Sequence, residues 1–496
     1  MKPEKEKATW SAARLQHEID QAIQHGSTLL GIPGGTYRFA NQTSLLVTRA
    51  SSLILEPQGR VELIFSGDEG VNFQHCTNVT FGSLGKDDDE NDKAIAIDYD
   101  PLPPPEPNFA EKSGITLNMF NCTHMKTYNV VIRAAPFIAV TAFNGGGGHL
   151  YQNIRFVPRN NTLASVRDAL HFTDLREGPT VKDSIIGFSG DDFFNVHTTL
   201  LVVLECSHSN SMCTLINPHV TMGAKRNSVY GTFSLLSHVQ KGDILSFYKW
   251  PNEDMIIRRI PNSNDSSNTQ TNQRDNYTIR HLHPETDPKV LAKAAKMPAR
   301  TAVSHGWISA TNRTANYTAE EVWQVHLDTP PPRTVQPGDL VAVDTINCAG
   351  AKFIHNTFLN SGCNVGRMKA SNVLFQDNFF QHARVPNLEI SVLPQWFEGP
   401  VEIQDVRFEN NIFAFSSKGG KNTKKAINPI HCGPLCEKPG CEFPPACSTC
   451  PDCLQDTPWA KHVVFVNNSF LPEKRTNDDQ SESFSRNAGQ PLEKDS

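Results

Sequence analysis

The sequence predicts an all-β fold: a parallel β-helix, or solenoid, with an N-terminal capping helix and an inserted small β-barrel-like module. Short strand candidates follow one another from residue 29 onward, and no helix separates one from the next. A Phe-x-x-Asn-x-Phe pattern then recurs at 353–358, 375–380, 408–413 and 465–470, and its first step, from Phe353 to Phe375, suits one coil. Because a single coil cannot bury its apolar side chains alone, neighbouring coils must stack.

The repeated positions predict two kinds of ladder. The phenylalanines would stack ring on ring inside the solenoid. The asparagines would stack at a turn, each side-chain amide bonding to the next, which is a structural role. The later steps of the repeat, from 375 to 408 and from 408 to 465, are longer and indicate coils that carry inserted loops. The asparagines concerned are Asn356, Asn378, Asn411 and Asn468.

Residues 1–28 form the N-terminal segment and carry the predicted capping helix. Four apolar residues recur at helical spacing and would form one stripe on a short helix that ends near Gly26. The open end of a solenoid must be covered, and this helix would cover it. The four residues are Leu15, Ile19, Ala22 and Ile23.

The rest of the chain divides by composition. Residues 29–219 would form the first part of the solenoid, with the candidate catalytic acids, and 346–472 the second part, with a Cys-rich loop at 430–455. In 220–345, two Gly-Asp pairs precede mostly apolar strands and flank an Asn-rich stretch and a short helical patch, which predicts the β-barrel-like insertion. Residues 473–496 are polar, and we expect them to be disordered.

Composition excludes several kinds of partner. The net charge is −6 with both signs interspersed, so no basic face would attract nucleic acid. No apolar stretch is long enough to span a bilayer. The acidic and Pro-rich stretch at 87–107 indicates a solvated loop, and a calcium site there is the alternative, disfavoured because alternating ligand spacing is missing. Nothing in the sequence indicates a cofactor, and the oligomeric state is left open.

Two observations favour the secretory pathway: nine Asn-x-Ser/Thr sequons, and twelve cysteines, an even set as disulfides require. The first residues lack the apolar core of a signal peptide. We therefore expect a secreted, glycosylated, disulfide-bonded protein whose N-terminus is incomplete or processed, with residence inside the cell as the alternative. The sequons begin at Asn41, Asn78, Asn121, Asn160, Asn264, Asn276, Asn312, Asn316 and Asn467.

The cysteines allow two kinds of crosslink. In the Cys-rich loop, the run of Cys447, Cys450 and Cys453 has a spacing that zinc can use. With the sequons in view we favour a disulfide-stapled loop, whose pairing the sequence leaves open. Cys206 and Cys213 are near enough in sequence to close a small loop.

Three acids in an apolar setting are the strongest candidates for chemistry. Asp168 is followed, one coil length further along the chain, by the vicinal pair Asp191 and Asp192. Acids flanked by Phe, Ile and Val are costly to bury unless they are paired or put to use. If one coil is about 22–24 residues, the three acids would occupy nearly equivalent places on coils about 4.8 Å apart. Repulsion would then raise at least one pKa, giving the protonated acid and the ionised base or nucleophile that glycosidic cleavage needs.

A non-catalytic interpretation of this trio is a carboxylate cluster that binds Ca²⁺ or caps turns. We predict catalysis and no metal. The stereochemical outcome depends on the gap between the carboxyl groups, about 5 Å for retention and roughly 6.5–9.5 Å for inversion, which spacing in sequence does not measure.

Residues around the trio are candidates for sugar binding. His171 and His197 would bond either to sugar hydroxyls or to backbone carbonyls. A tryptophan beside acids in a loop suits a sugar platform, because pyranose C–H faces pack on aromatic rings. The predicted substrate-binding residues are His171, Asn195, His197, Arg367, Glu389, Trp396 and Glu398.

Together these motifs resemble glycoside hydrolase family 110, the α-1,3-galactosidases. The helix and IPGGTY, then DALHF, GDDFFNVH, the two Gly-Asp strands and WFEGPVEIQDVRFENNIF occur in the order of that family, over roughly residues 10–415. The resemblance implies a right-handed parallel β-helix with inserted small β-barrels, and inversion at terminal α-1,3-linked galactose. It implies catalysis by three aspartates, which by motif are Asp168, Asp191 and Asp192. The chain departs from the family at 365–369, so we expect a divergent member.

We therefore predict an inverting, exo-acting α-galactosidase that acts on galactose-terminated glycans. The enzymic alternative is a polygalacturonase-like hydrolase of uronate polymers, in which Arg367 and Lys369 could bind a uronate carboxylate. The non-enzymic alternative is a glycan-binding or surface β-helix whose acids are structural.

Overall fold

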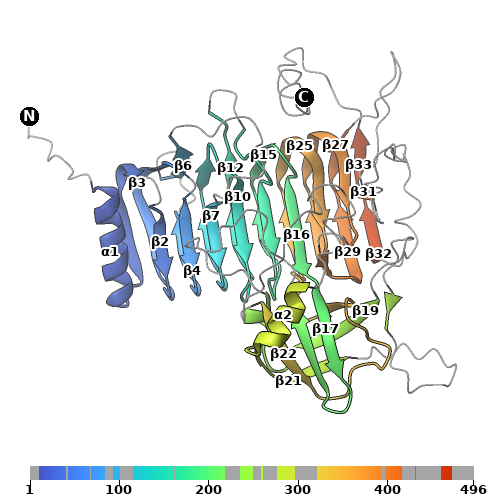
Figure 1. Cartoon of the computed structure of the whole chain (residues 1–496). Coiled ribbons are helices and arrows are strands. Elements are labelled where there is room, and N and C mark those ends of the chain that lie inside the picture. The colour runs from blue at the N-terminus through green and yellow to red at the C-terminus, as the bar shows by residue number, and fades with distance from the viewer. Residues whose placement is uncertain are drawn as a thin grey trace, which may run out of the picture.

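A computed structural model describes residues 10–40, 43–67, 69–83, 93–100, 115–159, 163–217, 235–249, 258–260, 276–296, 321–392, 397–415, 430–431 and 460–471. These residues form a 26-stranded sheet wound into a parallel β-helix and a separate seven-stranded sheet. Figure 1 shows the coils stacked along one axis, with helix α1 at one end and the second sheet to one side. The predicted all-β solenoid with a capping helix and a small barrel is confirmed.

The β-helix strands up to the insertion are β1 (Leu29–Phe39), β2 (Leu45–Thr48), β3 (Ile54–Phe65), β4 (Val71–Gln74), β5 (Thr80–Gly82), β6 (Ile95–Tyr99), β7 (Ile115–Phe120), β8 (Lys126–Tyr128), β9 (Val130–Ile132), β10 (Ile138–Phe143), β11 (Leu150–Gln152), β12 (Arg155–Phe156), β13 (Leu170–Thr173), β14 (Thr180–Lys182), β15 (Ile185–Ser189) and β16 (Phe194–Thr199). Those after it are β24 (Lys352–Ile354), β25 (Thr357–Met368), β26 (Val373–Gln376), β27 (Phe379–Glu389), β28 (Glu398–Gly399), β29 (Ile403–Glu409), β30 (Ile412–Ala414), β31 (Ile430–His431), β32 (Ala460–Val466) and β33 (Ser469–Leu471). The insertion holds β17 (Leu201–Ser207), β18 (Met212–Ile216), the 3₁₀ turn η1 (Leu235–Ser237), β19 (Ile244–Lys249), β20 (Arg258–Arg259), β21 (Tyr277–Pro284), α2 (Pro288–Lys296), β22 (Val322–Leu327) and β23 (Leu340–Val343).

Parallel pairing arranges the solenoid strands in three columns. One column runs β5–β8–β11–β14–β24–β26–β29–β32, and a second runs β6–β9–β12–β15–β25–β27–β30–β33. The third, called the site column below, runs β2–β4–β7–β10–β13–β16–β25–β27–β31. In the site column Leu170 pairs with Phe194, so these two residues lie exactly one coil apart.

Both predicted ladders are present. The rings of Phe358 and Phe380 stack with centroids 4.6 Å apart, and the other repeated phenylalanines continue the stack along the axis. The side-chain amide of Asn356 donates to Oδ1 of Asn378 at 3.1 Å, and that of Asn378 donates to Asn411 at 2.9 Å. Each coil thus satisfies polar groups of the next while burying its aromatic rings, which is the cooperation a solenoid requires.

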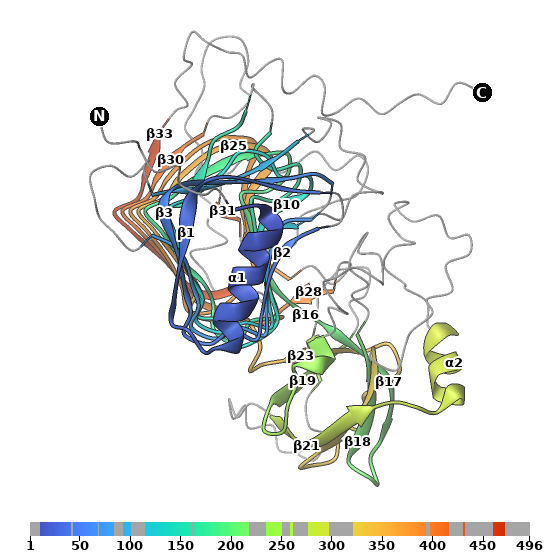
Figure 2. The same ribbon diagram turned by 90° about the vertical axis from the view of Figure 1, so that its left-hand side faces the viewer.

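The capping helix α1 (Ala12–Gln24) covers the first coil, as Figure 2 shows in the view along the axis. Ser11 is its N-cap, and the Ser11 hydroxyl accepts the amide of Arg14 at 3.1 Å. Leu15 and Ile19 are buried against the core. The side chain of Gln16 both accepts from the amide of Leu46 and donates to its carbonyl, at 2.8 and 2.7 Å. It therefore satisfies the exposed edge of β2, which would otherwise be free to pair with another chain.

The insertion closes into a barrel. Its antiparallel strands follow the ring β19–β21–β22–β18–β17–β23, which the β19–β23 pairing closes, and β20 adds to β19. The barrel starts at Leu201, earlier than the predicted boundary at residue 220. The strand at Leu201–Ser207 is as apolar as a solenoid strand, so composition alone did not separate the two. Helix α2 packs Ala294 against Leu204 and Val322 on the outside of the barrel.

Of the six described cysteines, Cys206 and Cys213 form a disulfide between β17 and β18, as the sequence suggested. The other four are free, and Cys363 among them lies beside the candidate site. Outside the described residues lie 432–455 of the Cys-rich loop, 262–275 of the Asn-rich stretch, most of 87–107 and everything beyond 471. Neither helix of the described parts is long and apolar enough to cross a membrane.

Candidate active site

Strand register brings Asp168 and Asp192 to equivalent positions on adjacent coils. Leu170 pairs with Phe194, and the pairing continues backward because the Ala169 amide donates to the Asp192 carbonyl at 3.0 Å. Asp168 thus matches Asp192 on the next coil, and Asp191 lies one place earlier. Strand β25, which follows the barrel in sequence, is in register with β16 as well, since Asn195 pairs with Arg367. The coil before the insertion and the coil after it therefore meet at the acids.

Glycines allow the coils to approach closely where the chain enters the acids. A Cβ atom on Gly362 would lie 2.4 Å from the carbonyl oxygen of Gly190, and one on Gly190 would lie 2.3 Å from that of Val166. Both distances are well inside van der Waals contact, so only glycine fits without moving backbone. At these two positions the coils therefore approach each other more closely than a side chain would allow.

Asp192 is the most buried of the three carboxylates, with a side chain 3 % exposed. Its Oδ1 accepts the backbone amide and the side-chain amide of Asn364, at 3.0 and 2.9 Å, and its Oδ2 lies 3.3 Å from Nε of Arg367. Burial raises the pKa of Asp192 to about 7; Arg367 opposes the shift, and the charges of Asp191 and Asp168 add to it. The raised pKa that the sequence predicted for at least one acid therefore falls on Asp192.

Asp168 opens a chain of contacts through two histidines. Its Oδ2 lies 2.8 Å from Nδ1 of His171, and Nε2 of His171 lies 3.0 Å from Nε2 of His197. Nδ1 of His197 lies 3.4 Å from the Thr198 carbonyl, and its Nε2 is also 3.1 Å from the hydroxyl of Thr173. The two imidazoles therefore link Asp168 to β16 by a continuous series of polar contacts.

Asp191 is the most exposed member of the trio, with 23 % of its side chain accessible. Its Oδ2 accepts from Nη1 of Arg167 at 2.8 Å, and the guanidinium of Arg167 lies over the ring of Phe137. The backbone carbonyl of Asp191 accepts from the hydroxyl of Ser361 at 2.7 Å, which ties it to β25. Asp191 thus faces outward on a fixed backbone.

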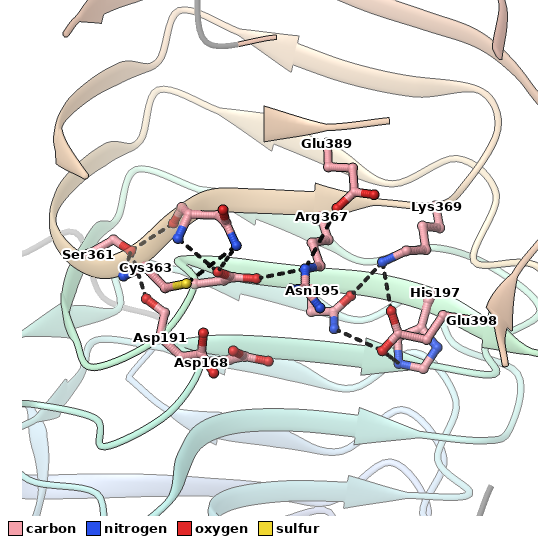
Figure 3. A network of polar contacts seen from close by, with 12 residues as sticks. Asp168, Asp191, Asn195, His197, Ser361, Cys363, Arg367, Lys369, Glu389 and Glu398 are labelled. Atoms are coloured by element: carbon pink, nitrogen blue, oxygen red, sulfur yellow. Dashed lines mark hydrogen bonds and ion pairs between the residues drawn. The ribbon is translucent and has the colours of Figure 1, made fainter. Parts of the chain in front are cut away.

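A buried ion network adjoins the acids, as Figure 3 shows. Arg367 lies among Asp192, Glu389 and Glu398, whose charges raise its pKa well above the ordinary value although burial opposes this. The ammonium of Lys369 is 2.8 Å from Oε2 of Glu398. Burial would raise the pKa of Glu398, but Lys369, His197 and Arg367 hold it well below its usual value. The cations and anions therefore neutralise one another away from water.

The structure brings most of the predicted sugar-binding residues together, with unequal access. His171, Asn195, Arg367 and Glu389 are successive partners along the site column. Glu389 and His197 are fully buried, so they support neighbouring side chains and do not line an open surface. Glu398 comes from β28, which pairs antiparallel with β16. Trp396 lies outside the described residues.

The sequence did not single out Arg167, Asn364 or Ser361. Asn364 is the residue in register with Asp192 on the following coil, and that coil comes only after the barrel. Arg167 lies 24 residues before Asp191, which is about one coil, so the sequence could have suggested it as a partner of Asp191. Ser361 had no signal, because its role depends on backbone geometry.

One group of described residues could approach a metal ion: carboxylate oxygens of Asp191 and Asp192 and the sulfur of Cys363 lie within 4.8 Å of one another. Burial, helped by the charges of Asp192 and Asp191, raises the pKa of the Cys363 thiol, which opposes the thiolate that a metal needs. In addition, Oδ1 of Asp192 faces two N–H donors of Asn364. The donor set fits a carboxylate that accepts hydrogen bonds better than it fits a cation ligand.

No protein-family model matches the chain, and no curated protein matches it. Among solved structures, the A-module of the mannuronan C-5 epimerase AlgE4 from Azotobacter vinelandii is similar, with a TM-score of 0.34 and 8% sequence identity over 94% of each chain. A likeness at this level says nothing about activity.

Proposed function

We propose that the chain is a glycoside hydrolase that acts through the aspartate trio. The observation that carries this proposal is Asp192, a buried carboxyl whose pKa is about 7, beside two further carboxylates. A general acid or base is most effective when its pKa is close to the working pH. A buried carboxyl with a strongly raised pKa next to charged partners is also typical of catalytic sites.

Exposure and register suggest how the work is divided. Asp192 is buried and its raised pKa lets it keep a proton near neutral pH, so it would protonate the leaving oxygen. Asp191 forms an ion pair with Arg167 and is the most exposed of the three, so it would take the proton of an attacking water that enters from solvent. Asp168 holds the position equivalent to Asp192 on the adjacent coil and would help to hold that water.

The substrate we propose is a terminal α-1,3-linked galactose, cleaved with inversion. This finer proposal rests on the resemblance of the DALH and GDDFFNVH motifs to glycoside hydrolase family 110. The uronate alternative is disfavoured by Lys369, which is fully buried and bound to Glu398, so it is not placed to meet a substrate carboxylate.

The test is incubation of the full chain with α-1,3-galactosyl oligosaccharides, aryl α-galactosides and polygalacturonate. We expect galactose release, with the β-anomer appearing first by NMR, and loss of release in D191N and D192N. Asp405→Asn is the matched control, because Asp405 is an exposed aspartate on β29, outside the site column. Hydrolysis of polygalacturonate alone would replace the substrate; binding without hydrolysis, unchanged in the two variants, would remove the enzyme proposal.

A division of labour can be tested separately from the substrate. Removing the proton donor should harm substrates with poor leaving groups most, because aryl leaving groups need little protonation. Asp192→Asn should therefore retain more activity on an aryl α-galactoside than on an oligosaccharide, whereas Asp191→Asn should lose both. The reverse pattern would exchange the two roles.

A further inference from the structure

Three histidines share one outward face of the barrel, away from the acids. β21 and β22 are antiparallel neighbours in which His281 pairs with His326 and His283 pairs with Gln324. The alternate residues Leu282 and Val325 pack into the barrel core. Because side chains alternate along a strand, the histidines point out of the barrel.

His326 lies between the other two rings at separations that one small cation can bridge. The ring centroids of His281 and His326 are 4.5 Å apart, and those of His283 and His326 are 5.7 Å apart. Zn²⁺ binds imidazole nitrogens at about 2.0–2.1 Å in tetrahedral geometry, and three protein ligands plus water make a complete set. The ring nitrogens do not all lie within 4.8 Å of one another. His281 is exposed, so rotation of its ring can narrow that gap while His283 keeps its orientation.

A second observation orients one of these rings. Nε2 of His283 lies 3.1 Å from Oε1 of Gln324, and the amide nitrogen of Gln324 donates to Glu285 at 2.6 Å. Glu285 also accepts the backbone amides of Thr286 and Asp287, each at 2.8 Å. The amide oxygen of Gln324 must therefore face His283, which makes Nε2 of His283 the protonated nitrogen. Nδ1 is left as the metal-binding atom.

This relay is the usual support for a metal-binding histidine, whose second nitrogen donates to a carbonyl or carboxylate. Neutral imidazole is the form that binds metal. Met212 pairs with His326 from the other side, on β18, and adds a polarisable thioether beside the trio.

We propose that His281, His283 and His326 bind one divalent transition-metal ion of the class that prefers imidazole, such as Zn²⁺. The ion crosslinks β21 to β22 and leaves one position for water. This site is independent of the proposed hydrolase activity.

The test uses Co²⁺ as a spectroscopic probe on the full chain, because the chain also has cysteines that can bind metals. We expect one saturable site with visible d–d bands and no sulfur charge-transfer band, and loss of this site in His326→Gln and in His281→Gln. The control is His462→Gln, which removes an exposed histidine of the solenoid. Near-UV circular dichroism shows whether each variant folds. If His326→Gln does not fold, the test rests on His281→Gln, because His281 is exposed.

A further variant tests the relay. Gln324→Leu keeps all three ligands but removes the acceptor of His283, and we expect Co²⁺ affinity to fall by about 10-fold. Absence of binding in the unmodified chain, binding with sulfur bands only, or binding unchanged in His281→Gln and His326→Gln would each overturn the site.

Discussion

The two halves of the site column share one face of the solenoid and differ in how their polar groups are satisfied. In the early coils, Asn72, Asn118 and Thr141 are successive partners, all buried and neutral. Thr141 donates to Asn118 at 2.8 Å, and Asn118 donates to Asn72 at 3.2 Å. The column thus supplies hydrogen bonds to itself, as the asparagine ladder does on the other side of the coil.

From His171 to Glu389 the same register positions carry ionisable groups, except at Asn195, and these groups also depend on residues outside those positions. Arg367 meets Asp192 from the preceding coil and Glu398 from β28, which belongs to a different part of the chain. Asp168 needs His171, and Asp191 needs Arg167. The neutral ladder thus gives way to a network of charges held from several parts of the chain, and the proposed catalytic acids lie in that network.

The largest effect should come from substituting an acid in the charged half of the site column. We expect Asp192→Asn to lower kcat on the galactosyl oligosaccharide by about 10²–10⁴-fold, because an amide cannot transfer a proton to the leaving oxygen. In the neutral half, Asn118→Ala should leave kcat unchanged once folding is verified. Steady-state kinetics on the two variants makes the comparison, and a similar loss of kcat in both would show that the halves do not differ in function.

The next effect concerns the buried ion pair. Lys369→Met leaves the buried carboxylate of Glu398 without its nearest cation, and we expect the free energy of unfolding to fall by about 3–5 kcal/mol. Replacing both partners, with Lys369→Met and Glu398→Gln together, should recover much of the loss. Denaturant titration of the two single variants and the double variant measures the coupling. Additive losses would mean that the pair is not coupled.

A third prediction concerns the pH dependence of stability. The pKa of Asp192 is raised from 3.8 to about 7 in the folded chain, so the folded chain binds a proton that the unfolded chain releases above about pH 4. The stability from this group is fully present below pH 4 and is lost as pH rises through 7. We expect unmodified protein to lose up to about 4 kcal/mol relative to Asp192→Asn between pH 4 and pH 8. Every other ionisable group is present in both proteins, so a parallel pH profile of the two would contradict this assignment.

The repetitive parts of this architecture were predictable because residues repeated at a fixed spacing show which positions of successive coils are neighbours. Phe358 and Asn378 belong to a pattern that states where the next coil lies, and Asp168 and Asp192 are separated by one coil with no insertion. The start of the barrel at Leu201 was missed because antiparallel barrel strands carry no such repeat. Asn364 was missed for the same reason, since its register with Asp192 spans the whole barrel.

The smallest effect tests whether the neutral half is a structural ladder. Asn118→Ala removes the acceptor of Thr141 and the donor to Asn72, leaving buried polar atoms without those partners. The expected loss is about 1–3 kcal/mol in the free energy of unfolding, because such atoms retain the cost of leaving water. Replacing the partner as well, with Asn118→Val and Thr141→Val, should cost less than the sum of the single changes. If the single change is neutral in denaturant titration, the column is not held together by these bonds, and the contrast with the charged half rests on the acids alone.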